Sequence, residues 1–180
     1  MFNFYCYLFL LCAISYPSQA FETSYLSLSP PPRWECKNKQ SEWLCRSTEP
    51  LVSKQAYLRI QAKLRNASDS TESYLNLLRQ PLTRRGLNNT IDMSKVYGAE
   101  IRPIHSHPWV VASHLGSEAK NYFTQYYVTT QGDLSILVEF TFHKSKYSYF
   151  APISEHLEKS FRLKSNIAAQ AKPIIISQPV

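Results

Sequence analysis

The stretch from residue 56 to residue 64 alternates strictly between apolar and polar side chains. This two-residue period is typical of a β-strand with one buried and one solvated face. The apolar face consists of Ala56, Leu58, Ile60, Ala62 and Leu64. The opposite face is basic, because it carries Arg59, Lys63 and Arg65.

The same period returns after Met93 and predicts strands at 96–102, 109–114, 122–130 and 134–143. The buried face of the last strand consists of Ile136, Val138, Phe140 and Phe142. The turn at 131–133 joins the last two strands into an antiparallel hairpin. Earlier in the chain, residues 21–29 predict a first strand, which three consecutive prolines end.

A short amphipathic helix is predicted after residue 69. Asp69-Ser-Thr-Glu72 has the form of a capping box, with Asp69 as the N-cap and Glu72 at position N3. The apolar residues that follow are spaced for one helix face, and Pro81 ends the helix. Residues 82–91 then read as a polar, basic loop.

A second helix is predicted at 145–160, where Phe150, Ile153, Leu157 and Phe161 are spaced for one helix face. Pro152 fits such a helix only in its first turn. Residues 161–163 predict a short return strand. Residues 165–180 are low in charge and contain two prolines, which predicts a flexible tail.

Two cysteines, Cys36 and Cys45, each follow a tryptophan by two residues. Folding this segment about residues 39–41 places the two cysteines opposite each other on neighbouring strands, close enough for a disulfide. A redox pair usually has two residues between its cysteines, and a zinc site needs more Cys or His ligands. The spacing therefore favours a structural disulfide, as expected in an oxidising compartment.

The N-terminus resembles a secretory leader. Residues 4–14 form an uncharged apolar run, and Ser18 and Ala20 supply the small residues of a cleavage site between Ala20 and Phe21. The run is too short to cross a bilayer as a helix. Two alternatives stay open: retention of the leader as an anchor, and a lipoprotein attached through Cys12.

These elements predict an α+β fold, a mostly antiparallel sheet with two or three helices packed on it and an N-terminal disulfide hairpin. The predicted organisation is a signal peptide at 1–20, one α+β domain at 21–164 and the tail at 165–180. Apolar residues make up 44% of the 180 residues and charged residues 18%, a balance that allows a packed core.

The chain carries a formal net charge of +7, all of it after position 20. In an exported protein this charge favours anionic envelope polymers or lipid headgroups rather than nucleic acid. The alternative is that the charge keeps the protein soluble and marks no binding site. With only 4 glycines, a glycine-rich phosphate loop is not expected.

The best candidates for metal ligands are His105, His107 and His114. In an extended segment His105 and His107 point the same way, as a pair of ligands requires. His114 would supply the third ligand, although Pro108 interrupts the segment. The alternative is that all three are ordinary polar residues at the start of a strand.

Glu139 is the best candidate for an acid or base, with His143 nearby on the same strand. A buried glutamate has a raised pKa and can exchange protons near neutral pH. A solvent-facing position on an amphipathic sheet is the alternative. No convincing second carboxylate supports a glycosidase pair. Ser113-His114 and Ser117-Glu118 lack the strained elbow of many hydrolases.

A basic patch is predicted for contact with anionic polymers. Its members are Arg59, Lys63, Arg65, Arg84 and Arg85. The alternative is an ordinary solvated face.

The order of elements resembles the Mog1/PsbP-like fold across residues 24–164. The resemblance is carried by Tyr126-Tyr-Val-Thr-Thr, by the long strand to His143 and by the 145–163 segment ending in Ser160-Phe-Arg-Leu. It implies an accessory or binding role, since members of that fold are mostly accessory proteins.

The cysteine hairpin, His114-Leu-Gly-Ser-Glu118 and Asn121-Tyr are also similar to a group of uncharacterised exported proteins of Gram-negative bacteria. The sequence thus predicts a non-enzymatic accessory or binding protein of the periplasm or the extracellular space, without a cofactor. Its expected partner is another envelope protein or an anionic envelope polymer, and the mature chain should have no transmembrane span. The alternative is a secreted hydrolase or metal-dependent enzyme that uses the His105, His107 and His114 region.

Overall fold

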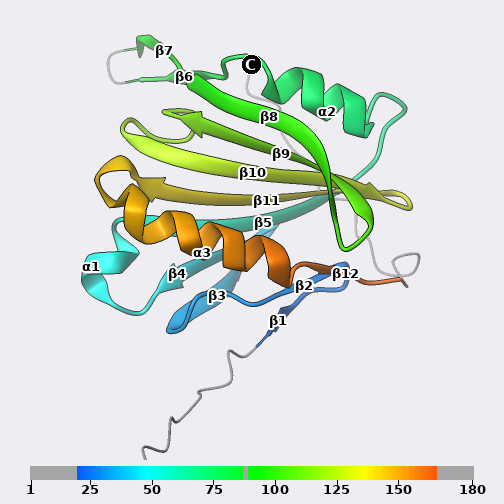
Figure 1. Ribbon diagram of the computed structural model, residues 1–180, viewed down its shortest axis with the longest axis horizontal. Helices are drawn as coiled ribbons and strands as arrows, with labels where there is room; N and C mark the ends of the chain where they lie inside the picture. Colours follow the sequence, from blue (N-terminus) through cyan, green and yellow to red (C-terminus); the bar gives the residue numbers. More distant parts are fainter. Residues whose placement is uncertain (1–19, 87–88, 166–180) are drawn as a thin grey trace, which may run out of the picture.

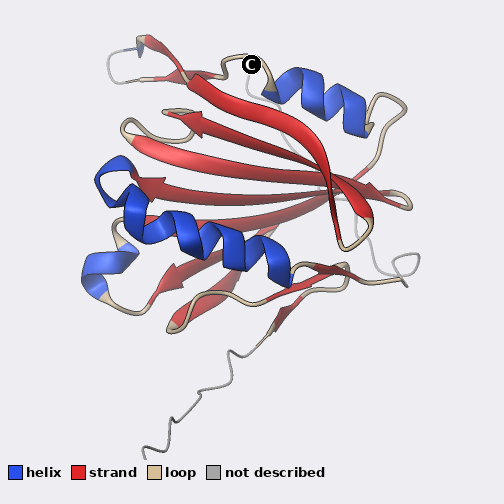
Figure 2. Ribbon diagram, viewed as in Figure 1, coloured by secondary structure: helices blue, strands red, loops and turns tan. Residues whose placement is uncertain are grey.

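Seven antiparallel strands form the central sheet of the computed structural model, which describes residues 20–86 and 89–165 (Figures 1 and 2). Their order across the sheet is β3-β4-β5-β11-β10-β9-β8. The strands are β3 Trp34–Lys39, β4 Glu42–Ser47, β5 Ala56–Leu64, β8 Lys95–Ile104, β9 His107–Leu115, β10 Tyr122–Gln131 and β11 Leu134–His143. The predicted signal peptide and tail lie almost entirely outside the described residues.

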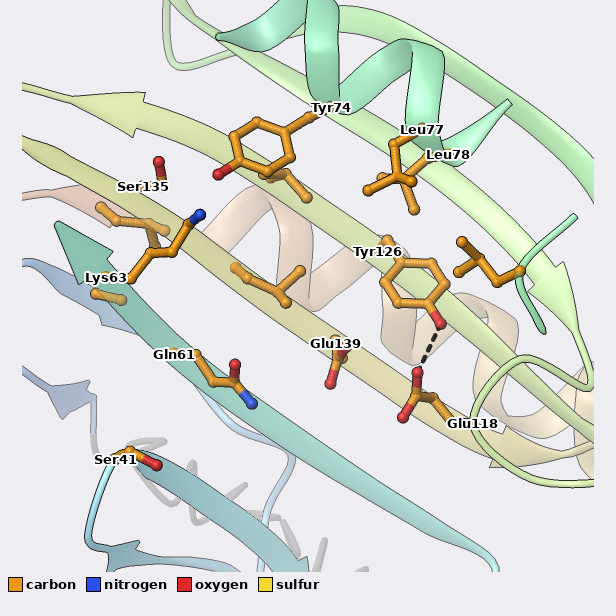
Figure 3. Close-up of a pocket in the computed structure, with 15 residues that line it drawn as sticks. Ser41, Gln61, Lys63, Tyr74, Leu77, Leu78, Glu118, Tyr126, Ser135 and Glu139 are labelled. Atoms are coloured by element: carbon orange, nitrogen blue, oxygen red, sulfur yellow. Dashed lines mark hydrogen bonds between the residues drawn. The ribbon is translucent and has the colours of Figure 1, made fainter. Parts of the chain in front are cut away.

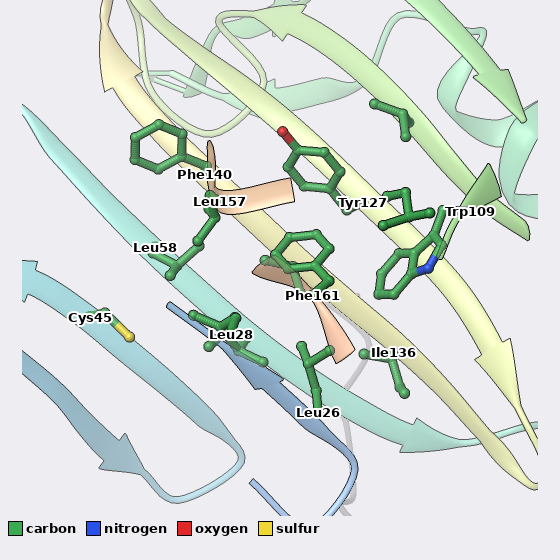
Figure 4. Close-up of a cluster of buried hydrophobic side chains, with 14 of the residues drawn as sticks. Leu26, Leu28, Cys45, Leu58, Trp109, Tyr127, Ile136, Phe140, Leu157 and Phe161 are labelled. Carbon is green, nitrogen blue, oxygen red and sulfur yellow. The ribbon is translucent and has the colours of Figure 1, made fainter. Parts of the chain in front are cut away.

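The first face of this sheet carries the main core. It is covered by helix α3 (Tyr147–Ser160) and by a small sheet of β1 (Phe21–Glu22), β2 (Leu26–Leu28) and β12 (Arg162–Leu163), as Figure 1 shows. Figure 4 shows how Leu28 and Phe161 from this cover meet residues such as Leu58 and Phe140 of the central strands. The predicted inward residues of β11 are all fully buried, because alternate residues of a strand share a face.

The second face is only partly covered. Helix α2 (Thr71–Leu78) packs on β8, β9 and β10, where Leu75 and Leu78 join a smaller apolar cluster with Val110 and Val128. The helix stops short of β3, β4 and β5 (Figure 2). This unequal cover leaves part of the sheet open beside the helix.

The strands predicted from the two-residue period are confirmed, and β5 has the predicted bounds. The α+β class and the return strand are also confirmed. Leu64 differs from expectation, because it is 47% exposed at the end of β5.

Two local predictions were wrong, one for the first strand and one for the second helix. Residues 21–29 form two short paired strands, because Thr23 accepts hydrogen bonds from the amides of Tyr25 and Leu26 and so makes a turn. A one-turn helix, α1 (Pro50–Ser53), follows Glu49. Pro152 lies beyond the first turn of α3, which begins at Tyr147 after a 3-10 turn at Lys144–Lys146.

Two further corrections concern the middle of the chain. The N-cap of α2 is Ser70, whose side chain accepts from the Ser73 amide, and not Asp69. The loop predicted at 82–91 contains two paired strands, β6 (Thr83–Arg85) and β7 (Ile91–Met93). An ion pair between Arg84 and Asp92 joins these strands.

The predicted disulfide between Cys36 and Cys45 is confirmed. The two residues are direct partners in the β3–β4 register, and their Cα atoms are 3.9 Å apart. Cys45 is fully buried in the main core, whereas β3 is an edge strand with one neighbour. The bond therefore ties an edge strand to the core.

Breaking this bond should destabilise the fold. The cross-link spans nine residues in sequence, and a loop of this length contributes about 2–3 kcal/mol by restricting the unfolded chain. Urea unfolding with and without a reductant should show that loss in the wild type. The double variant Cys36→Ser with Cys45→Ser should be equally weakened and indifferent to reductant. An unchanged midpoint on reduction would contradict the assignment.

Candidate functional site

A groove of about 320 Å³ lies where α2 leaves the second face of the sheet uncovered (Figure 3). One wall of the groove is formed by α2 and the segment that follows it, through Leu77, Leu78 and Leu82. Its floor is formed by β5, β10 and β11, with Val128 and Leu137 in the middle. Leu77 is 56% exposed because it borders the groove instead of the apolar cluster beneath the helix. The groove therefore has an apolar middle that is open to solvent.

Polar side chains gather at the two ends of the groove. Figure 3 shows Lys63, Tyr74 and Ser135 at one end, and Tyr126, Glu118 and Glu139 at the other. Ser135, Leu137 and Glu139 follow each other on one face of β11, so the two ends lie roughly 13 Å apart along that strand.

Arg59 is the centre of the acidic end. Its guanidinium contacts three carboxylates: Glu139 Oε2 at 2.8 Å, Glu118 Oε2 at 3.3 Å and Glu42 Oε2 at 3.3 Å. The Tyr126 hydroxyl donates to Glu118 Oε1 at 2.8 Å. One guanidinium thus faces three carboxylates, which leaves the end with an excess of negative charge when all are ionised.

Glu139 is the most buried of these carboxylates, with 5% of its surface exposed. Burial raises the pKa of Glu139 to about 7, the negative charge of Glu118 adds to this rise, and Arg59 opposes it. Of the two alternatives drawn from the sequence, the buried position is the one that Glu139 takes, and it does not face open solvent. A role of Glu139 as an acid or base stays a prediction.

The other end of the groove is held together by Asp69. This carboxylate accepts from Lys63 at 3.0 Å, from the Tyr74 hydroxyl at 2.7 Å and from the Asn66 amide at 2.8 Å. These bonds explain why Asp69 does not cap α2. The hydroxyl of Ser135 is buried and lines the groove beside Tyr74.

The structure does not bring the three candidate histidines together. The segment expected to be extended is a hairpin turn, with His105 and Ser106 at positive φ. His105 contacts the Lys159 carbonyl and Arg162, while His107 contacts the Thr130 carbonyl at 3.1 Å. No group of three or more potential metal ligands occurs among residues 20–86 and 89–165.

His114 is buried and has a different environment. Its ring lies between the Leu78 carbonyl at 2.8 Å and the Ser94 hydroxyl at 2.9 Å, and burial lowers its pKa. The ring therefore fastens the end of α2 to β9. Ser113 lies on the opposite face of the same strand, so these neighbours do not form a nucleophile–base pair.

His143 and Glu139 share a face of β11 but have separate partners. The His143 ring bonds to Ser145 at 2.8 Å and packs on Tyr122.

The residues of the predicted basic patch do not form one surface. Arg59, Lys63 and Arg84 are paired with carboxylates, and Arg65 donates to backbone carbonyls. Arg84 and Arg85 lie on β6, beyond β8 and away from β5, the strand of Arg59 and Lys63 (Figure 1).

Comparison with known proteins supports the fold alone. The sequence matches no family model and no curated protein. The structure is similar to the solution structure of cyanobacterial PsbP (CyanoP) from Synechocystis sp. PCC 6803, with a TM-score of 0.58, 9% identity, and coverage of 81% of this chain and 92% of that one. The PsbP-like resemblance is thus confirmed as a resemblance of fold.

A crystal structure from Bacteroides thetaiotaomicron VPI-5482 is also similar, with a TM-score of 0.57 and 17% identity. That match covers 83% of this chain but spans only 49% of the Bacteroides protein. Within the described part of this chain, no helix is long and apolar enough to cross a membrane.

The raised pKa of Glu139 predicts a pH dependence of stability. In the unfolded chain this glutamate loses its proton near pH 4.5, whereas in the folded chain it does so near pH 7. The folded state binds more protons between these values, so the free energy of unfolding should fall as pH rises through this window, by about 3 kcal/mol.

Urea unfolding at several pH values should show this fall in the wild type and a flatter profile in Glu139→Gln. Glu155→Gln, an exposed position on α3, is the matched control and should retain the wild-type slope. Identical slopes in wild type and Glu139→Gln would show that Glu139 titrates normally.

Proposed function

We propose that this chain is an exported accessory protein of the cell envelope that binds a small, largely apolar ligand in the groove beside α2. The groove carries this proposal, because a partly enclosed apolar cavity with few polar groups at defined places is the usual form of a small-molecule site. Its volume of about 320 Å³ is at the lower end of the range for such sites.

The geometry favours binding over catalysis. The hydrolase or metal-enzyme alternative needs His105, His107 and His114 to act together, and each has its own set of partners in a different place. Glu139 has the burial of a catalytic acid, but its carboxylate is paired with Arg59. A binding role uses the groove without requiring a nucleophile.

Export is supported by two features of the N-terminal region. The disulfide fits an oxidising compartment. The first strand begins at Phe21, directly after the proposed cleavage site, and the Phe21 ring packs against Trp43 at 5.0 Å between centroids. A chain cleaved after Ala20 would keep every described strand. The proposal includes a single domain at residues 21–164 and a location in the periplasm or the extracellular space.

Filling the groove should abolish binding without unfolding the protein. Leu77→Trp places a large ring in the groove from an exposed position, so binding of the neutral apolar dye Nile red should weaken by about tenfold or more. Ile91→Trp is the matched control, because Ile91 is 74% exposed and lies outside the groove. Fluorescence titration of both variants, with circular dichroism to verify folding, provides the measurement. Equal affinities in both variants would contradict a ligand site in this groove.

The processing of the chain can be measured directly. Intact-mass spectrometry of protein recovered from its native source should give a chain that begins at Phe21 and has lost two hydrogens to the Cys36–Cys45 bond. Native material that begins at Met1 and has both thiols free would contradict export.

A further inference from the structure

The acidic end of the groove has a charge opposite to that of the whole chain. The protein has a formal charge of +7, yet Glu42, Glu118 and Glu139 surround a single guanidinium, that of Arg59. The other cation of the groove, Lys63, is already paired with Asp69. The groove therefore has a deficit of positive charge where Glu118 and Glu139 line it.

The two carboxylates at the acidic end of the groove can accept further hydrogen bonds. Glu139 receives Arg59 on Oε2 at 2.8 Å, and Glu118 receives Arg59 on Oε2 and the Tyr126 hydroxyl on Oε1. Each carboxylate oxygen has two acceptor positions, and both side chains line the groove. A ligand that supplies donors here therefore gains hydrogen bonds as well as an opposite charge.

Resting on the proposed function, we infer that the groove selects a primary amine carried on an apolar chain. The ammonium group lies between Glu118 and Glu139, and the chain runs over Leu137 and beside Leu77 and Leu78 toward Ser135. An ammonium supplies three donors and one positive charge, which matches both the acceptor capacity of the two carboxylates and the deficit of charge.

The same contacts discriminate against other head groups. A carboxylate at this position would face Glu118 and Glu139 and be repelled. An alcohol offers one donor and no charge, so it would gain the apolar contacts but not the ion pair. Selection by head group is therefore expected to be strong, while the apolar chain supplies a contribution common to all three ligands.

Binding should also move a proton. Near neutral pH the buried Glu139 is partly protonated, and an incoming ammonium favours its ionised form. The Glu139 carboxyl then loses its proton to the solvent, and the ammonium keeps all of its own. At pH 7 the expected release is about half a proton per ligand, falling toward zero at higher pH where Glu139 is already ionised.

Calorimetric titration of the mature chain with octylamine, octanol and octanoate at about pH 7 tests this inference. Octylamine should bind at least about tenfold more tightly than octanol, with octanoate weakest. Repeating the octylamine titration in buffers of different ionisation enthalpy should reveal the released proton. Glu139→Gln and Glu118→Gln should each weaken octylamine by about tenfold and leave octanol unchanged. Glu155→Gln on α3 is the control and should bind all three ligands as the wild type does.

The outcomes separate this inference from the proposed function. Equal binding of the three ligands, or tighter binding of octanoate, would overturn amine selection and leave the groove as an apolar site. Failure of all three ligands and of Nile red to bind would overturn both. If Glu139→Gln does not fold, Glu118→Gln provides the test, because Glu118 is more exposed; an unchanged octylamine affinity in that variant would overturn amine selection.

Discussion

The pairing of β5 with β11 is the constraint on which both the core and the groove depend. In this register Ile60 lies opposite Val138 and Arg59 lies opposite Glu139. Because side chains alternate between the faces of a sheet, the register that buries the first pair in the main core places the second pair together on the other face. A slip of one residue would expose the apolar set and separate the ion pair, so core packing fixes the geometry of the acidic end.

The groove itself results from unequal cover. Within residues 20–86 and 89–165, the first face is closed by α3 and a three-stranded sheet, whereas the helix on the second face is α2, which has eight residues. His114 fastens the end of this helix at Leu78, and Asp69 secures the loop before it. These bonds hold the helix over β8 to β10, so part of β5 and β11 lies open beside it.

Much of this fold could be predicted from the sequence, because its long strands are strongly periodic. The alternation at 56–64 and 134–143 identified the two central strands, and the spacing of Cys36 and Cys45 identified the disulfide. What was missed depends on contacts distant in sequence. Nothing in the sequence near Glu118 indicates that its carboxylate reaches Arg59, 59 residues earlier. The cap of α2 was misplaced by one residue because tertiary contacts engage Asp69. The one local signal for the site was the central position of Glu139 in an apolar strand.

The candidate site also shows that the local charge of a groove can differ from the net charge of the chain. The excess of basic residues predicted a patch for anions, and several of its members lie on or beside the groove. Arg59 and Lys63, however, are already matched by carboxylates from Glu42, Glu118, Glu139 and Asp69. The charges within such a buried or half-buried pair attract each other strongly, because little water lies between them. The attraction of dispersed surface charges is weaker, because water and salt screen it. The charge that a ligand in this groove would meet is therefore set by the few carboxylates within contact distance, and its sign can oppose that of the whole chain.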